Sequence, residues 1–174
     1  SSDLVQRPLR SGGRPHRLPR AVAARDLLAQ DALWEAGQEA QTTAAELRRE
    51  VISWGWWSYA RRSGLAYLQA RPYSGSIRTA TFADCSSWVT LLYREAGAPD
   101  PNGRGYDGYG FTGTLWERGT NIELDALKAG DLVFYGHHPS IPGAPGHVAI
   151  AHSADRVLSF GSYPIRELPV RYRW

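Results

Sequence analysis

The stretch DCSSWVTLLYREAG, residues 84–97, predicts the helix around which the rest of the chain is arranged. Its apolar residues recur at helical steps, and Gly97 is well placed to end the helix. Asp84 can cap the N-terminus, which leaves Cys85 in the first turn. The helix dipole and the free backbone N–H groups at that end favour an anion, and a thiolate is such an anion. The stretch therefore suits an activated cysteine nucleophile.

Cys85 is the only cysteine among 174 residues, so no intramolecular disulfide holds this fold. A lone buried cysteine is most often just a small hydrophobic residue. A zinc site is a further alternative, but no CxxC or HxxxH pattern supports it. We therefore expect no metal and no cofactor, and the choice between a structural cysteine and a nucleophile depends on whether a base accompanies it.

Five histidines are candidates for that base: His16, His137, His138, His147 and His152. His147 opens the run HVAIA, whose apolar character places it at the start of a strand. A strand start is a more rigid platform than the loop of three prolines that follows Gly136. We therefore favour His147 as the general base.

Three short β-rich runs follow the helix and predict an antiparallel sheet. They are GDLVFYG, GHVAIAH and DRVLSFG, at residues 130–136, 146–152 and 155–161, with turn signals between them. Asp131, in the first run, is interpreted as a turn residue at a strand entry and not as a catalytic acid. A helix followed by several strands, with residues 98–114 as a long Gly- and Pro-rich loop, indicates an α+β fold.

The chain before residue 64 divides into two parts. Residues 1–20 form an irregular basic leader with five arginines against one aspartate. Such a leader can contact nucleic acid or an anionic wall polymer, but a solvated arm is the favoured interpretation. Residues 21–63, rich in Ala, Leu, Glu, Gln and Arg, predict a helical extension of one long or two shorter helices. Residues 64–174 then form the main domain.

An aromatic cluster lies at the end of that extension, in SWGWWSYARRSGLAYL at residues 53–68. Such a cluster can stack on sugar rings, but packing against a core is the commoner role. Composition is that of a globular protein, with 43% hydrophobic and 21% charged residues. No apolar stretch is long enough to span a membrane, and no signal peptide is visible.

The motif series DCSSWVTLLYREAG, LKAGDLVFYG and GHVAIAHSADRVLSFGS resembles that of the NlpC-type peptidoglycan endopeptidases. The resemblance covers roughly residues 65–165. It implies a papain-like core, in which a helix with the cysteine packs on a small antiparallel sheet with the histidine. Residue by residue, it implies Cys85 as nucleophile and His147 as base. In RPYSG it implies Tyr73 as the tyrosine whose hydroxyl helps at the oxyanion site.

The third catalytic position departs from the resembled family. That position is usually a polar residue, often histidine, about twelve residues after the base, and here it is Ser159. Serine can accept a hydrogen bond from an imidazole N–H but has no charge to stabilise imidazolium. His152, Asp155 or a backbone carbonyl could serve instead. If the strand register slips by one residue, Phe160 would point into the site and Ser159 away from it.

The resemblance implies a thiol protease that cleaves peptidoglycan stem peptides, commonly between D-isoglutamate and diaminopimelate. The loop at 98–114 is similar to versions from actinobacteria and their phages, so we expect a phage lysin or tail-associated lysin. The alternatives are an N-acetylmuramoyl-L-alanine amidase or an acyltransferase on the same fold, or a catalytically inactive wall-binding or virion structural module. We expect bacterial peptidoglycan as partner, no nucleic acid, a monomer, and a secreted or virion-associated location at the bacterial cell wall.

Overall fold

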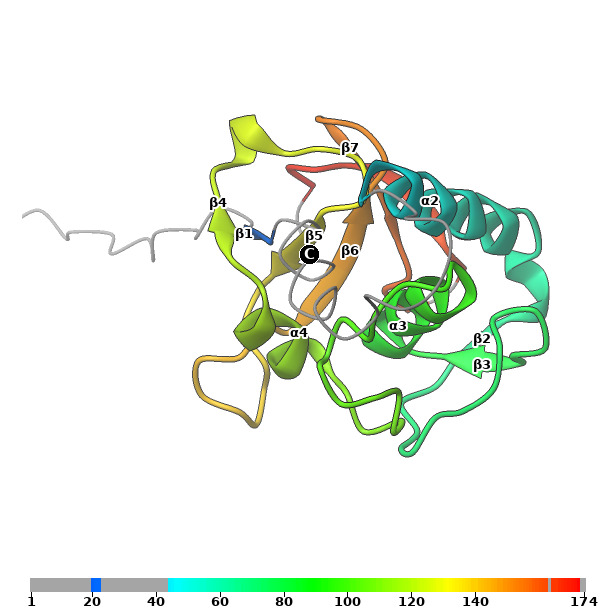
Figure 1. Cartoon of the computed structure of the whole chain (residues 1–174). Helices are drawn as coiled ribbons and strands as arrows, with labels where there is room; N and C mark the ends of the chain where they lie inside the picture. The colour runs from blue at the N-terminus through cyan, green and yellow to red at the C-terminus, as the bar shows by residue number, and fades with distance from the viewer. Residues whose placement is uncertain (1–19, 23–43, 163, 173–174) are drawn as a thin grey trace, which may run out of the picture.

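The computed structural model describes residues 20–22, 44–162 and 164–172, and these residues form an α+β fold (Figure 1). The main sheet has the order β4-β1-β5-β6-β7-β8, and every neighbouring pair in it is antiparallel. Its strands are β1 Arg20–Val22, β4 Asn121–Ile122, β5 Leu132–Tyr135, β6 His147–Ala151, β7 Arg156–Ser159 and β8 Arg166–Pro169. The α+β class and the three β-rich runs are therefore confirmed.

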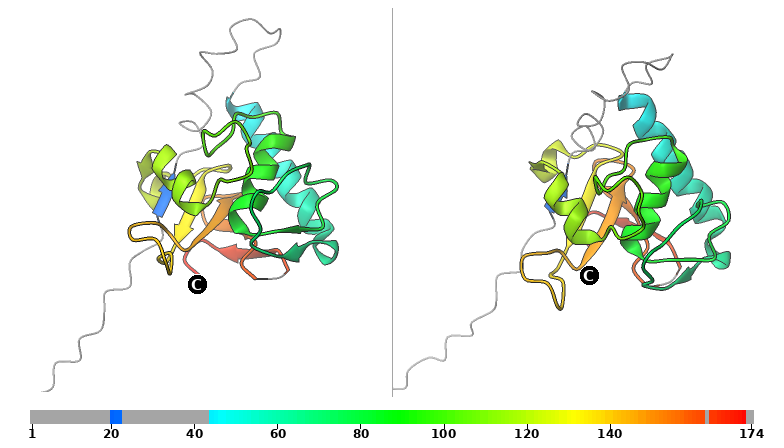
Figure 2. Two further views of the ribbon diagram at one scale, coloured as in Figure 1. Left: turned by 90° about the horizontal axis from the view of Figure 1, so that it is seen from below. Right: turned by 60° about the horizontal axis from the view of Figure 1, so that its bottom comes forward.

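The remaining elements are three α-helices, two 3-10 turns and a small parallel pair of strands within the described residues. They are α2 Ala44–Ala60, η1 Arg62–Gly64, β2 Ala66–Tyr67, β3 Phe82–Ala83, α3 Cys85–Glu95, α4 Thr112–Arg118 and η2 Leu124–Ala126. Helices α2 and α3 lie on the same side of the main sheet (Figures 1 and 2). None of the helices in these ranges is long and apolar enough to cross a membrane.

Helix α3 has the limits that its sequence predicts. Asp84 caps its start: its carboxylate accepts the Ser87 N–H at 2.7 Å, and the Ser87 hydroxyl accepts the Asp84 N–H at 2.8 Å. At the other end Gly97 adopts φ +70, and Ala98 N–H donates to Tyr93 C=O at 3.0 Å. This left-handed ending is a position that glycine fills without strain. The helix is thus fixed at both ends, and its first residue is Cys85.

The main core lies between the sheet and the two helices α2 and α3. Strand β6 alternates between faces: Val148 and Ile150 enter this core, whereas Ala149 and Ala151 enter a smaller cluster on the opposite face. His147 is two residues before Ala149 and shares the alternation of the smaller cluster. Apolar side chains therefore pack against both faces of the sheet at strand β6, which begins with the candidate base His147.

Helix α2 packs into the same core as α3. The Trp88 indole N–H donates to the Ser58 hydroxyl at 3.0 Å, and a Cβ on Gly55 would lie 3.1 Å from Leu158. The aromatic cluster divides between two roles. Trp54 and Tyr59 pack against the core, and this confirms the packing interpretation for them, whereas Trp56 is 37% exposed.

Helix α2 lies within residues 21–63, the range predicted as a helical extension. Residues 23–43 lie outside the described residues, as do residues 1–19 of the predicted leader. Residues 20–22 differ from the prediction, because they form strand β1 between β4 and β5. Strand β5 offers main-chain N–H and C=O groups at this position. The hydrogen bonds that residues 20–22 make with them stabilise a strand more than the helix propensity of the surrounding sequence stabilises a helix.

Helix α4 begins inside the stretch predicted as a loop. Phe111 is its N-cap, and the Phe111 N–H donates to the Thr114 hydroxyl at 2.9 Å. The sequence TGT is a poor helix former, because threonine is β-branched and glycine is flexible. Residues 98–111 remain a loop, in which the Asp100 carboxylate accepts three main-chain N–H groups, from Asn102, Arg104 and Tyr106.

Candidate active site

Cys85 is the first residue of α3, and its side chain is buried. Its thiol has hydrogen bonds with the main chain of Val148 and Ser86 and with the hydroxyl of Tyr67. Burial, followed by the neighbouring Asp84 carboxylate, nevertheless raises the pKa of the thiol to about 11. This differs from the lowered thiol pKa that a helix N-terminus alone favours, because removal from water and a nearby negative charge both oppose the thiolate.

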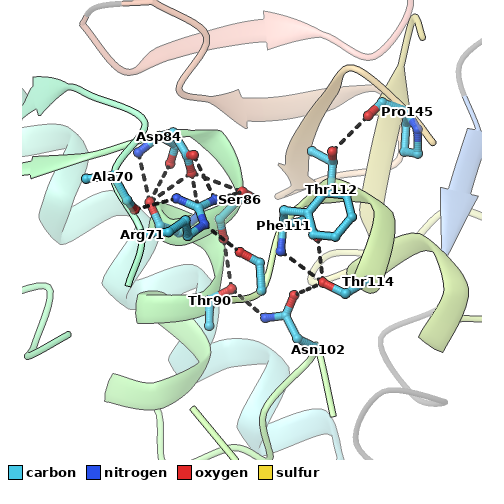
Figure 3. Close-up of polar contacts among 12 residues, drawn as sticks. Ala70, Arg71, Asp84, Ser86, Thr90, Asn102, Phe111, Thr112, Thr114 and Pro145 are labelled. Atoms are coloured by element: carbon cyan, nitrogen blue, oxygen red, sulfur yellow. Dashed lines mark hydrogen bonds and ion pairs between the residues drawn. The ribbon is translucent and has the colours of Figure 1, made fainter. Parts of the chain in front are cut away.

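Asp84 is anchored on both sides by polar groups (Figure 3). Besides the helix N–H that it caps, its carboxylate accepts a 2.8 Å ion-pair hydrogen bond from Arg71 Nη2 and a 3.0 Å bond from the Ser86 hydroxyl. Arg71 also donates from Nε to Gly110 C=O at 2.9 Å and lies 4.8 Å above the Tyr73 ring. Arg71 therefore joins the start of α3 to the loop that precedes α4.

His147 opens β6 and is fully buried. Its Nε2 lies 2.9 Å from the Ser159 hydroxyl at the end of β7. Burial lowers the pKa of His147 to about 3, so the imidazole is neutral at pH 7. Val148 follows His147 directly and its main chain contacts the thiol, so the structure places the start of β6 next to Cys85.

The register of β7 turns Ser159, and not Phe160, toward His147. Phe160 packs in the main core, with ring centroids 5.2 Å from Tyr67 and 6.2 Å from Trp88. Ser159 pairs with Ala149 across the sheet, on the face that His147 shares. The alternative with a one-residue slip is therefore absent from this structure.

The two other side chains considered as partners of His147 are engaged elsewhere. His152 Nε2 lies 3.0 Å from Glu167, and Asp155 accepts a 2.8 Å hydrogen bond from Ser153. His138 accepts a main-chain N–H from Ser140 through Nδ1. His16 lies outside the described residues, and His137 is exposed in the loop between β5 and β6.

The tyrosine whose hydroxyl bonds the thiol is Tyr67, in β2. Tyr73 is buried, and its hydroxyl has a hydrogen bond with Thr90, one turn into α3. Sequence reasoning missed Tyr67, since a strand of two residues carries no periodic pattern. In the structure Tyr67 pairs with Ala83, two residues before Cys85, and this non-local pairing places it near the thiol.

A second tyrosine absent from the sequence reasoning lies behind Ser159. The Tyr172 hydroxyl is 2.9 Å from Ser159 Oγ. Burial raises the pKa of Tyr172 to about 12, against a smaller opposing effect of the Ser159 hydrogen bond. Tyr172 follows the motif series and β8, so no local pattern connects it with His147.

A hydrogen-bonded network forms one side of this region (Figure 3). Asn102 Nδ2 donates to the Thr90 hydroxyl at 2.9 Å, and its Oδ1 accepts from the Thr114 hydroxyl at 2.7 Å. The Thr112 hydroxyl donates to Pro145 C=O at 2.8 Å, two residues before His147. Hydrogen bonds of this network therefore connect α3, the 98–111 loop, α4 and the segment before β6.

No group of three or more His, Cys, Asp and Glu side chains in residues 44–162 and 164–172 is arranged to hold a metal ion. The site offers a thiol, an imidazole and hydroxyl groups, which are the groups of nucleophilic and acid–base chemistry. A cysteine at a helix start beside a histidine at a strand start is an arrangement typical of cysteine hydrolases.

The model of the NlpC/P60 family matches residues 70–164, more than half of the chain. The chain therefore belongs to the NlpC/P60 family, whose members are generally cysteine peptidases and peptidoglycan hydrolases. The matched region contains Cys85, His147, Ser159 and Tyr73, whereas Tyr67 and Tyr172 lie outside it.

A solved structure with the same fold is a lipoprotein-like member of the NLP/P60 family from Staphylococcus aureus subsp. aureus Mu50. It is 20% identical, with a TM-score of 0.52, over 80% of this chain and 40% of that one. This chain thus spans less than half the length of that protein. No curated protein is similar enough in sequence to match the chain.

Proposed function

We propose that the protein is a cysteine peptidase that hydrolyses the stem peptides of bacterial peptidoglycan, at a bond of the D-isoglutamyl–diaminopimelate type. The observation that carries the proposal is the His147–Ser159 contact of 2.9 Å at the start of β6, where the main chain of the next residue, Val148, contacts a thiol at the start of α3. Membership of the NlpC/P60 family supports the substrate class. The bond itself is the finer part of the proposal and rests on the resemblance of the motifs.

His147 acts as the general base in this mechanism. Its Nε2 is held by Ser159, so Nδ1 takes the proton from the Cys85 thiol. Burial disfavours both charged forms, so the resting pair is neutral, and the thiolate–imidazolium pair forms as substrate binds. Transfer of the proton within the pair leaves its net charge unchanged, and this limits the cost of charge formation in a buried site.

The thiolate attacks the scissile carbonyl carbon and forms a tetrahedral oxyanion. The main-chain N–H of Cys85, at the first turn of α3, donates to that oxyanion. Collapse of the intermediate expels the amine, which takes its proton from imidazolium, and leaves an acyl-enzyme. His147 then deprotonates a water molecule that hydrolyses the thioester and frees Cys85.

A tyrosine hydroxyl is the second oxyanion donor in this proposal. The resemblance assigns that role to Tyr73, and the assignment stays a prediction. The hydrogen bond between the Tyr67 hydroxyl and the thiol supports Tyr67 as the alternative donor. The Tyr73 hydroxyl bonds Thr90, so it would need to turn to reach the substrate.

The proposed setting follows from the substrate, which lies outside the bacterial cytoplasm. We propose that the protein works as a monomer at the cell wall, either secreted or as part of a phage particle. A phage lysin or tail-associated lysin fits both the substrate and the resemblance of the 98–114 loop.

The first test compares the wild type with Cys85→Ala and Cys85→Ser on purified sacculi. Because nucleophile and base act as a unit, both variants should lose several orders of magnitude in the rate of hydrolysis. Melting temperatures serve as the control for folding. Mass spectrometry of the soluble products identifies the bond: a free diaminopimelyl amine supports the proposal, whereas a free muramoyl carboxylate indicates an amidase.

Undiminished hydrolysis by Cys85→Ala would refute the mechanism. Wild-type protein that binds sacculi without releasing any product would instead support an inactive wall-binding module. Transfer of the acyl group to an added amine, without release of acid, would indicate an acyltransferase.

A further inference from the structure

A row of three polar groups runs from the candidate base to the end of the described chain. His147 Nε2 lies 2.9 Å from Ser159 Oγ, and Ser159 Oγ lies 2.9 Å from the Tyr172 hydroxyl. The row joins the start of β6, the end of β7 and the segment after β8. We propose that Tyr172 is a positioning residue, which acts through Ser159 to hold the His147 ring in the tautomer that accepts the thiol proton. The proposal rests on the proposed function of Cys85 and His147.

The hydroxyl of Ser159 carries one hydrogen, which can point to either neighbour. If it points to His147 Nε2, the ring proton sits on Nδ1, and Nδ1 cannot accept the proton of Cys85. If it points to the Tyr172 oxygen, a serine lone pair faces Nε2 and accepts its N–H. The Tyr172 oxygen thus accepts the Ser159 O–H. The serine oxygen is then free to accept the Nε2–H of His147, as the proposed mechanism requires.

The contact between Ser159 and Tyr172 has a larger effect after the thiol proton has moved from Cys85 to His147. Imidazolium carries hydrogens on both ring nitrogens, so Ser159 must accept the Nε2–H and cannot donate to the ring. Ser159 and His147 are 1% and 0% exposed, so water is not at hand to take the serine hydrogen. The Tyr172 oxygen can take it, and this stabilises the charged state of His147 in a site that otherwise disfavours charge.

Packing holds the Tyr172 ring in the position from which its hydroxyl reaches Ser159 Oγ. Its centroid lies 4.8 Å from that of Tyr135, whose own hydroxyl donates to Val170 C=O at 2.9 Å. Tyr172 N–H donates to Pro169 C=O at 3.0 Å, closing a turn after β8. The hydroxyl is therefore placed by a tilted ring contact and a turn as well as by Ser159.

The experiment compares Tyr172→Phe with Tyr93→Phe. Tyr93 is a matched control, because its buried hydroxyl also has one hydrogen bond, to Gly130 C=O at 3.2 Å, and lies away from the row. Kinetics on a soluble stem peptide should show that Tyr172→Phe lowers kcat about tenfold with KM unchanged, the size expected for one lost hydrogen bond in the transition state. Tyr93→Phe should stay within about twofold of the wild type in kcat, whatever it does to the melting temperature.

The same substitution in a Ser159→Ala background separates positioning from a structural role. If Tyr172 acts through Ser159, Tyr172→Phe should cause no further loss of kcat once the serine hydroxyl is gone. An equal loss in both backgrounds, or a kcat within about twofold of the wild type for the single variant, would overturn the proposal.

Alkylation of Cys85 by iodoacetamide at pH 7 gives a readout that needs no substrate. Because the chain has one cysteine, the rate reports only on this thiol. Tyr172→Phe should slow alkylation severalfold, Tyr93→Phe should not, and the effect should vanish in Ser159→Ala. If the wild type hydrolyses no stem peptide, the proposed function fails, and the alkylation rates still decide whether Tyr172 positions His147.

Discussion

Burial is the dominant electrostatic effect on the two central residues of the site. It raises the pKa of Cys85 and lowers that of His147, and in both cases it favours the neutral form. Ser159 cannot reverse this effect, because its hydroxyl brings a dipole and no charge. In the proposed mechanism, catalysis therefore depends on oriented hydrogen bonds, from Tyr67 to the thiol and from His147 through Ser159 to Tyr172.

The buried His147 should make the fold sensitive to acid. Its pKa is about 3 when folded, against an ordinary value of 6.5, so the unfolded state binds more protons between these values. Stability should therefore fall as the pH drops from 6.5 toward 3. Thermal melts at pH 7 and pH 4.5 should show a larger decrease for the wild type than for His147→Gln, which keeps a polar side chain without titrating. Equal decreases for both would contradict the low pKa.

The two tyrosines proposed as oxyanion donors can be distinguished by the same substitution at each. Tyr67→Phe removes the hydroxyl that bonds Cys85, so kcat should fall by about tenfold to a hundredfold if that hydroxyl also donates to the oxyanion. Tyr73→Phe removes the hydroxyl that bonds Thr90 and should mainly lower the melting temperature. The opposite outcome, with kcat lost in Tyr73→Phe and kept in Tyr67→Phe, would restore Tyr73 to the role that the resemblance implies.

At the scale of elements, prediction from sequence succeeds where the signal is local. The start and end of α3 follow from Asp84 and Gly97, and strands β5, β6 and β7 follow from short apolar runs between turns. The contact between His147 and Ser159 follows from the pairing of adjacent strands, since twelve residues bring the end of β7 back beside the start of β6.

Local sequence patterns do not predict the elements that form only through contacts with residues far away in the chain. Strand β1 exists because β5 and β4 offer it main-chain hydrogen bonds a hundred residues away, and β2 has two residues with no pattern of their own. The same reason hides Tyr172, which reaches Ser159 only because β8 pairs with β7 and the chain turns after Pro169. Tertiary contacts of this kind override local preference and leave no periodic trace.

Over the whole molecule, the folded unit extends beyond the region that the family model matches. Helix α2 lies before residue 70, yet Val51 belongs to the main core and Ser58 accepts the hydrogen bond of Trp88 in α3. Arg48 of the same helix has a 2.9 Å ion pair with Asp131, at the entry to β5. A fragment trimmed to the matched region would therefore expose the apolar surface that α2 covers.

Two truncations of the N-terminus should have different effects because β1 begins at Arg20. Removing residues 1–19 takes away four arginines and Asp3 but leaves the strand, so kcat on a small soluble stem peptide should stay within about twofold of the full chain. Binding to sacculi at low salt should weaken, since the lost charge attracts anionic wall polymers, and added salt should abolish the difference. Removing residues 1–22 also removes β1, which leaves β5 without a partner on one side and should lower the melting temperature by roughly 5 °C or more. Equal melting temperatures for the two truncations would show that β1 adds nothing to the sheet, and loss of peptide hydrolysis on removing residues 1–19 would show that the arginine-rich segment takes part in catalysis.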